Sequence, residues 1–476
     1  MQTISLKRLL IIPAIIFPLL SNGQEPWSLE QCINYALENN IRIKQQKINV
    51  TYAENNYQQS KIDRYPSLNA SGSYGVSFGR ALDQTTYQFT EDQTIKSSNL
   101  SLSSSTILFN GFQKQNTIKQ NYFDLQAGLY DLERLKNDVS LNIAAAYLQI
   151  LFNKELLEVS KAQLEVTKLQ VERTRLLVES GSLARGSLLE IQAQEAAEEV
   201  QIINAENNLN LSYLSLMQIL DLDVNTPFTI VIPEITSISE EDLVAGPDQV
   251  FNEALGILPQ IKSSTSRLKS AEKAYDIARG YRSPRLSLSA SYGSGYSDIR
   301  ERIIGSEAII IPFGETASGE EVFARTQSPV TSTYPFINQL KDNASTSLFL
   351  SISIPIFNGN QINNSIKNAR LGMENSKLEL EFARNSLYEE INRAYTDANA
   401  ALKKYTASEK ALAAMEESFK YTREKYELGL VTTVDFNAAK NQLLKTQSDL
   451  LQSKYDFIFK VNILNFYRGR SIKINS

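Results

Sequence analysis

The chain has 476 residues, of which 48 are Lys or Arg and 53 are Asp or Glu, so its net charge at pH 7 is −5. An acidic chain without a basic cluster is not typical of proteins that bind nucleic acid. Histidine is absent and Cys32 is the only cysteine, which excludes imidazole bases, His- or Cys-based metal centres and intramolecular disulfides. Because no nucleophile–base constellation is visible either, we expect neither an enzyme nor a bound cofactor or metal.

Residues 1–23 have the pattern of a secretory signal peptide. Lys7 and Arg8 precede an apolar run over residues 9–20, and small residues follow that run. Twelve residues of helix reach only about 18 Å, short of the ~30 Å hydrocarbon core of a membrane. Cys32 lies too far beyond the run to be a lipidation site, so we expect an exported chain without a lipid anchor.

The remainder of the sequence contains two copies of one module, which predicts a first repeat over 24–246 and a second over 247–476. Residues 34–75 match residues 252–293 without a gap, with 15 identities in 42 positions. A second match, at a shift of 248 residues, continues the alignment through the rest of each copy. A duplication of this size indicates that both copies adopt the same arrangement of elements.

Each copy holds two segments in which apolar and small polar residues alternate. The predicted strands are about 66–78 and 98–109 in the first copy, and about 284–296 and 344–357 in the second. Such alternation gives a sheet one apolar and one polar face. The lack of charges, the aromatics near the ends and the length favour a membrane barrel over an ordinary half-buried sheet. The loop between the strands spans 24 residues in one copy and 54 in the other, which marks the extracellular end.

The segments that follow the strands have helical periodicity. The predicted long helices are about 113–180 and 187–220 in the first copy, and about 361–428 and 435–467 in the second. Apolar residues recur in steps of three and four, which predicts an apolar stripe on each of the longest helices. The stripe residues are Leu129, Leu132, Leu135, Val139, Ile143, Ala146 and Ile150, then Leu378, Phe382, Leu387, Ile391, Ala394 and Ala398.

Each long helix is expected to turn back on itself at a glycine. Gly181 and Gly429 supply the left-handed backbone that ends a helix. Ser187 and Asp435 are suitable N-cap residues for the returning helices. Each copy is therefore predicted to contain an antiparallel hairpin of two long helices.

Four strands cannot close a barrel, and open sheet edges are not stable in lipid. The smallest single-chain barrels use eight strands, so we expect a cyclic oligomer whose copies seal each other's edges. Two copies would give eight strands with little lumen, whereas three give twelve. A trimer is therefore the preferred prediction.

The order of the elements resembles that of the TolC family of outer-membrane efflux proteins. The most specific matches are Pro66-Ser67-Leu68, Pro284-Arg285-Leu286, the Phe-Asn-Gly junctions before the long helices, and the tip sequence 429–435. The resemblance covers the chain from Trp27 onward. It implies a mainly α fold with a membrane β-barrel: a homotrimer whose 12-stranded β-barrel continues into a 12-helix α-barrel in the periplasm.

The resemblance also implies a function and partners. The trimer would be a passive exit duct, set in outer-membrane lipid, for a tripartite efflux system. It would be fed by an inner-membrane pump and opened when a periplasmic adaptor docks on the hairpin tips. The corresponding tip residues are Gly181, Ser182, Leu183, Gly186, Gly429, Leu430, Val431 and Thr432.

In the family, the closed state is held by a tyrosine, an arginine and carboxylates near the tip. Tyr426 and Asp435 match two of these positions and are the candidate periplasmic gate, but the other three positions hold Val431, Ala438 and Ser187. Most of the ionic latch is therefore missing. Three copies of Asp435 would form a charged ring that favours cations or binds a divalent ion; alternatively, Asp435 only caps a helix.

Other functions are compatible with part of the sequence. A type I protein-secretion duct has the same fold, and no feature of the sequence separates it from an efflux duct. A periplasmic adaptor would have one hairpin flanked by glycine-rich β domains, and a trimeric coiled-coil adhesin would have strands only at its C-terminus. The two hairpins and the strands ahead of each long helix disfavour both.

Overall fold

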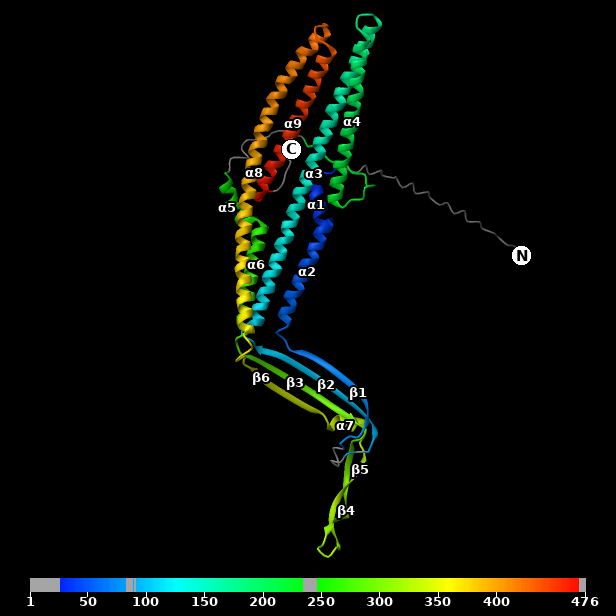
Figure 1. Cartoon of the computed structure of the whole chain (residues 1–476), viewed down its shortest axis with the longest axis vertical. Coiled ribbons are helices and arrows are strands. Elements are labelled where there is room, and N and C mark those ends of the chain that lie inside the picture. The colour runs from blue at the N-terminus through cyan, green and yellow to red at the C-terminus, as the bar shows by residue number, and fades with distance from the viewer. Residues whose placement is uncertain (1–25, 83–88, 90, 234–245, 471–476) are drawn as a thin grey trace, which may run out of the picture. The chain divides into compact units, whose positions relative to one another are not determined.

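The structure, a computed structural model shown in Figure 1, describes residues 26–82, 89, 91–233 and 246–470. The expected signal peptide, residues 1–23, lies outside the described residues. The chain forms two compact units. Among the described residues, the helical unit comprises 26–49, 129–233, 246–262 and 382–470, and the sheet unit comprises 50–82, 89, 91–128 and 263–381.

Eight of the described helices fall into two matching sets, one for each copy of the repeat. They are α1 Leu29–Asn39, α2 Ile41–Ile62, α3 Gln113–Glu179 and α4 Arg185–Leu220, then α5 Pro247–Ile257, α6 Pro259–Gly280, α8 Gln361–Glu427 and α9 Thr433–Tyr467. Helices α3 and α8 have 67 residues each, because neither contains a proline and each has only one glycine. Among the described helices, none is apolar over a stretch long enough to span a membrane.

The helical segment that opens each copy is interrupted at equivalent positions, by different chemistry. Asn40 ends α1, and its side-chain Oδ1 accepts hydrogen bonds from the N–H groups of Arg42 at 3.0 Å and Ile43 at 3.3 Å. It therefore caps the first turn of α2. In the second copy Pro259 starts α6, where its missing N–H is not needed, because the first turn of a helix leaves its N–H groups unpaired.

The apolar stripe predicted on the longest helices is buried only in part. The predicted residues Leu132, Val139, Ile143, Ile150, Leu387, Ile391, Ala394 and Ala398 are buried. Leu129, Leu378 and Phe382 are instead exposed, by 37%, 63% and 73%. These three side chains belong to the apolar stripe but remain partly or largely exposed within a single copy of the chain.

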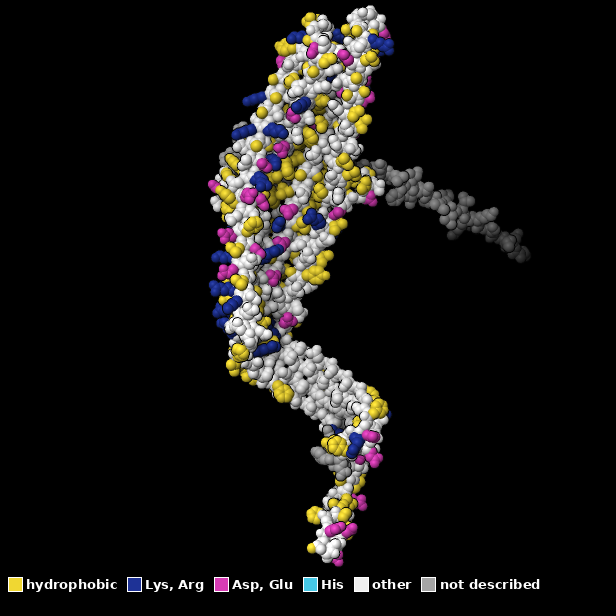
Figure 2. Space-filling view, in the orientation of Figure 1, with side chains coloured by type: hydrophobic (Ala, Val, Ile, Leu, Met, Phe, Trp, Pro, Cys, Tyr) yellow, Lys and Arg dark blue, Asp and Glu magenta, His cyan; other side chains and the backbone are white. Residues whose placement is uncertain are grey.

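The sheet unit contains a four-stranded antiparallel sheet in the order β1-β2-β3-β6. The strands are β1 Ser67–Gly79, β2 Gln93–Phe109, β3 Arg285–Ser297 and β6 Ser345–Ser353. Strand β2 starts five residues earlier than predicted and includes a charge, Lys96, opposite Val76. The predicted division into two faces is confirmed by the register, because Leu68, Leu102 and Leu348 share one face while Ser67, Ser101 and Ser347 share the other. Figure 2 shows one face of this sheet as a nearly continuous area of side chains that are neither hydrophobic nor charged.

Serine hydroxyls connect neighbouring strands across the polar face. Ser67 and Ser105 lie 3.2 Å apart, Ser71 and Ser101 lie 2.7 Å apart, and Ser287 and Ser351 lie 2.8 Å apart. These hydroxyls satisfy one another and are exposed. The sheet therefore presents a serine-rich polar surface on one side, with Arg285 as its one charged residue, and a mainly apolar surface on the other.

The long loop predicted between β3 and β6 is mostly structured. It contains a separate two-stranded antiparallel sheet, β4 Glu301–Glu315 with β5 Glu321–Thr333, and a short helix α7, Phe336–Asp342. Gly319 turns the hairpin in a left-handed conformation, with φ +85°. These two strands were not predicted. Runs of β-branched residues such as Ile309–Ile311 favour strands, but they have no counterpart in the first copy.

Helix α7 completes the edge of β3 where β6 ends. Strand β6 pairs with β3 only as far as Gly293. Beyond it, the N–H of Ser297 donates to Gln339 Oε1 at 3.0 Å, Gln339 Nε2 donates to the Ser297 carbonyl at 2.9 Å, and Asn343 Nδ2 donates to the Gly295 carbonyl at 2.6 Å. Two amide side chains thus replace the missing strand, and Gln339 is fully buried.

Candidate functional site

The two helical hairpins end in the same backbone turn. At the first tip, the N–H of Ser182 donates to the Leu177 carbonyl at 2.8 Å and that of Gly181 to the Val178 carbonyl at 3.0 Å. At the second tip, the N–H groups of Leu430 and Gly429 make the same two bonds, at 2.9 and 3.1 Å, to Lys425 and Tyr426. This is the Schellman pattern. Gly181 and Gly429 have φ +76° and +72°, so both positions favour glycine, as predicted.

The returning helices begin differently at the two tips. Helix α4 follows Ala184, which makes no side-chain capping bond, and Gly186 is its exposed second residue. Helix α9 follows Thr432, whose side chain accepts from the N–H of Asp435 while Asp435 accepts from the N–H of Thr432. The predicted N-caps, Ser187 and Asp435, are therefore wrong. Both lie inside their helices, because the tip turns are shorter than expected, and Asp435 contributes the other half of a capping box.

Apolar side chains are exposed at both tips. Leu183 at the first tip is 38% exposed, while Leu428, Leu430 and Val434 at the second are 75%, 69% and 61% exposed. Val431 beside them is half-buried. Exposed apolar clusters framed by polar residues are typical of surfaces that bind another protein. The tips therefore offer apolar contacts on rigid, glycine-terminated helix ends.

Tyr426 belongs to an aromatic cluster inside the second hairpin. Its ring stacks on Phe436 with centroids 4.5 Å apart and planes 22° apart, and Phe419 lies 5.6 Å from Phe436 on another side. Phe436 is fully buried. The stack places Tyr426 of α8 against the first turn of α9. Its partner in the stack, Phe436, directly follows Asp435 in the sequence.

Asp435 is exposed and already has local partners. Its Oδ2 accepts from Thr432 Oγ1 at 2.7 Å and from the Thr432 N–H at 3.2 Å. These hydrogen bonds hold the pKa of the Asp435 carboxyl below its ordinary value. The carboxylate is therefore charged at neutral pH while it caps α9, so capping and a role in a charged ring are compatible.

One exposed ion pair joins the two hairpins close to the tips. Arg173 on α3 lies 3.8 Å from Glu427 on α8, and both side chains are 45% exposed. Exposed pairs of this kind contribute about 0–1 kcal/mol. This contact is a weak connection.

A second connection, further from the tips, is buried and joins three helices. Lys440 Nζ on α9 lies 2.9 Å from Glu198 Oε1 on α4, with side chains only 2% and 3% exposed. The same ammonium donates to the Gln163 carbonyl of α3 at 2.8 Å and to Thr167 Oγ1. Thr167 in turn donates to Glu198 Oε2 at 2.6 Å. We call Lys440, Glu198 and Thr167 the buried lock.

The buried lock is fully hydrogen-bonded. Gln194 Nε2 donates to Glu198 Oε1 at 2.8 Å and to Asn441 Oδ1 at 3.0 Å, which extends the network to the surface. Burial lowers the pKa of the Lys440 ammonium, and the attraction of Glu198 opposes that shift. Removing one partner of such a pair typically costs about 3–5 kcal/mol, because the other charge is left unpaired.

The buried lock was not predicted from the sequence, although its residues lie on apolar stripes. Lys440 falls between the buried Phe436 and Leu443 at helical spacing, and Glu198 falls seven residues after the buried Ile191. A charge at a core-facing position needs a partner of opposite sign. One basic and one acidic residue at core-facing positions of different helices could therefore have indicated a buried ion pair.

Comparisons with known proteins agree with this architecture. Residues 32–221 and 250–469 match the family model described as outer membrane efflux protein. Among solved structures, CusC has a TM-score of 0.74 at 16% identity, with 93% of this chain and 92% of that chain covered. VceC from Vibrio cholerae has a TM-score of 0.73 at 18% identity, covering 94% and 97%, and the open state of MtrE from Neisseria gonorrhoeae has 0.73 at 16%, covering 94% and 90%.

The comparison with curated protein sequences gives no match. The structural likenesses establish the fold, and the match to the family model extends over most of the sequence in two segments, one for each copy of the repeat. Such a family consists of efflux channels rather than enzymes. The chain belongs to the outer membrane efflux protein family.

Proposed function

We propose that three copies of this chain form a passive exit duct in the outer membrane. The observation that carries the proposal is the four-stranded sheet, which has an apolar face, a polar face, and edges at β1 and β6 that pair with no further strand of the described residues. Edges of this kind are stable in lipid only when they are paired. Three sheets joined β6 to β1 give twelve strands, with the serine-rich faces toward the lumen.

The hairpin tips support the rest of the proposal. An inner-membrane pump would supply the substrate, and a periplasmic adaptor would dock on the exposed apolar residues at the tips, among them Leu183 and Leu430. The adaptor opens the duct if it binds the open arrangement of the tips more tightly than the closed one. Asp435, charged and exposed, would give the tip constriction a ring of three carboxylates that favours cations.

The native mass of the detergent-extracted protein tests the proposal. Light scattering with the detergent subtracted is expected to give three times the mass of the mature chain. A folded monomer would contradict the proposal, because the sheet edges would then have no partner.

Replacing Leu350 on the apolar face by Asp should reduce membrane insertion, whereas Ser351→Asp on the polar face should not.

A further inference from the structure

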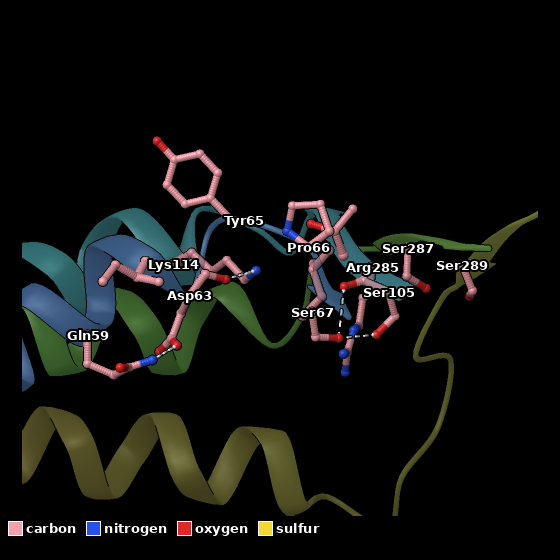
Figure 3. Close-up of a pocket in the computed structure, with 13 residues that line it drawn as sticks. Gln59, Asp63, Tyr65, Pro66, Ser67, Ser105, Lys114, Arg285, Ser287 and Ser289 are labelled. Atoms are coloured by element: carbon pink, nitrogen blue, oxygen red, sulfur yellow. Dashed lines mark hydrogen bonds between the residues drawn. The ribbon is translucent and has the colours of Figure 1, made fainter. Parts of the chain in front are cut away.

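A solvent-open cavity of about 500 Å³ lies on the sheet unit, where β1, β2 and β3 meet the ends of α2 and α3. Its lining includes the hydroxyls of Ser67, Ser105, Ser287 and Ser289 and two cations, Lys114 and Arg285. Figure 3 shows the Arg285 side chain beside Ser67 and Ser105. The volume falls within the range of about 300–1,000 Å³ that is usual for small-molecule sites.

The two cations have little compensation within this cavity. Lys114 Nζ donates to the backbone carbonyl of Asp63 at 2.5 Å, which leaves two of its protons for other acceptors. The carboxylate of Asp63 instead accepts from Gln59 Nε2 at 2.6 Å. Within the described residues, no carboxylate forms an ion pair with Lys114 or Arg285. Asp63 is the one carboxylate among the lining residues, so the lining carries two positive charges and one negative charge.

Arg285 is also the one charged residue on the polar face of the four-stranded sheet. The register places Arg285 opposite Ser353, with Ser287 and Ser289 next along the same face. The remaining residues of that face, along all four strands, are uncharged. No carboxylate on this face lies beside Arg285 to offset its charge.

The repeat shows that the fold does not need these two cations. Arg285 aligns with Ser67 at the shift of 218, and Lys114 aligns with Ile362 at the shift of 248. The equivalent backbone positions therefore accept a small polar and an apolar side chain. A structural role would apply to both copies, whereas the charges occur in only one copy each.

We propose that this cavity is an anion-binding site of the duct, selective for solutes that carry a phosphate or carboxylate group. Arg285 binds the anion through its guanidinium, and Lys114 adds a second charge. In each serine pair one hydroxyl proton is used between the two residues, and the accepting hydroxyl keeps its own proton to donate to the anion. The position on the polar face rests on the proposed function, in which that face lines the lumen. Three such sites would give the lumen a basic zone, distinct from the acidic tips.

The first test measures binding of inorganic pyrophosphate to the detergent-purified full-length protein by calorimetry at constant ionic strength. We expect Arg285→Ser, which copies the residue of the first repeat, to raise the Kd at least tenfold, as loss of a charge-assisted hydrogen bond would. Lys114→Ile should raise it less, and Arg285→Lys should retain part of the affinity. Lys119→Ile is the matched control, because Lys119 lies on the same helix but does not line the cavity.

The second test measures reversal potentials in planar bilayers under a potassium chloride gradient. Arg285→Ser should shift the permeability ratio toward potassium by about twofold or more, and Lys119→Ile should leave it unchanged.

Absence of pyrophosphate binding by the wild type, or equal affinity in wild type and Arg285→Ser, would overturn the site. A protein that binds pyrophosphate through Arg285 but does not conduct would contradict the duct and leave the site standing.

Discussion

The hairpins α3–α4 and α8–α9 share their backbone turn but differ in the side chains around it. Both turns end at a glycine with the same pair of hydrogen bonds. Only the second hairpin has a capping box and an aromatic stack beside its tip, and the first holds Glu198, the acidic partner of Lys440. The two copies therefore share the backbone turn of the tip. They differ in the residues that cap the returning helix, stack beside the tip and form the ion pair between the hairpins.

The largest effect should come from breaking the connection between the hairpins. Lys440→Met leaves Glu198 buried without its partner and is expected to destabilise the helical unit by about 3–5 kcal/mol. Urea unfolding followed by circular dichroism measures this. The matched control, Arg173→Met, removes the exposed connection and should cost at most about 1 kcal/mol.

The double variant Lys440→Met with Glu198→Leu separates charge from packing. It should recover most of the stability lost in Lys440→Met, because no buried charge remains. If Lys440→Met alone and Glu198→Leu alone both unfold at the wild-type urea concentration, the buried lock contributes nothing to stability.

A smaller effect should follow from exchanging the cap chemistry of the two tips. Thr432→Ala removes the hydroxyl that caps α9 and should cost about 1 kcal/mol, whereas Ala184→Asp should stabilise α4 by a similar amount. Thermal unfolding of both variants measures the difference. Equal and opposite shifts would show that the tips differ only in capping; a large loss in Thr432→Ala would indicate a further role for the second tip.

The smallest effect concerns pH. The pKa of Asp435 is lowered in the folded chain, so its contribution is present above the ordinary aspartate pKa of about 3.9 and is lost as pH falls through the lowered value. Wild type should melt above Asp435→Asn at pH 6, and the difference should vanish in acid. A difference that persists at pH 2 would mean that the charge of Asp435 does not stabilise the cap.

Most of the fold could be predicted because its signals are local. The absence of proline and near absence of glycine from 113–179 and 361–427 predicts the two 67-residue helices within a residue. Alternation of apolar and small residues predicts the four strands and their faces. The β4–β5 hairpin was missed, because it has no counterpart in the other copy to align with.

The connections between the hairpins depend on non-local pairing, which a single sequence does not reveal. Lys440 and Glu198 are 242 residues apart, and each alone resembles an ordinary charge on a long helix. Arg285 and Lys114 likewise lie at the start of a strand and of a helix. The sequence alone does not indicate that they line one cavity. The cap at Ala184 shows a third limit, since the start of a helix depends on the turn before it rather than on the nearest good capping residue.

Helix α7 has a consequence for how far copies of the chain can join. By replacing the strand beside β3 beyond Gly293, Gln339 and Asn343 leave the nine residues of β6 as the outer edge. At ~3.3 Å per residue this edge is about 30 Å long, and a tilt of ~40° reduces its height to about 23 Å, close to the ~25 Å apolar band of membrane barrels. In the proposed trimer, α7 would therefore limit the strand pairing between subunits to the part of β6 that lies within the membrane.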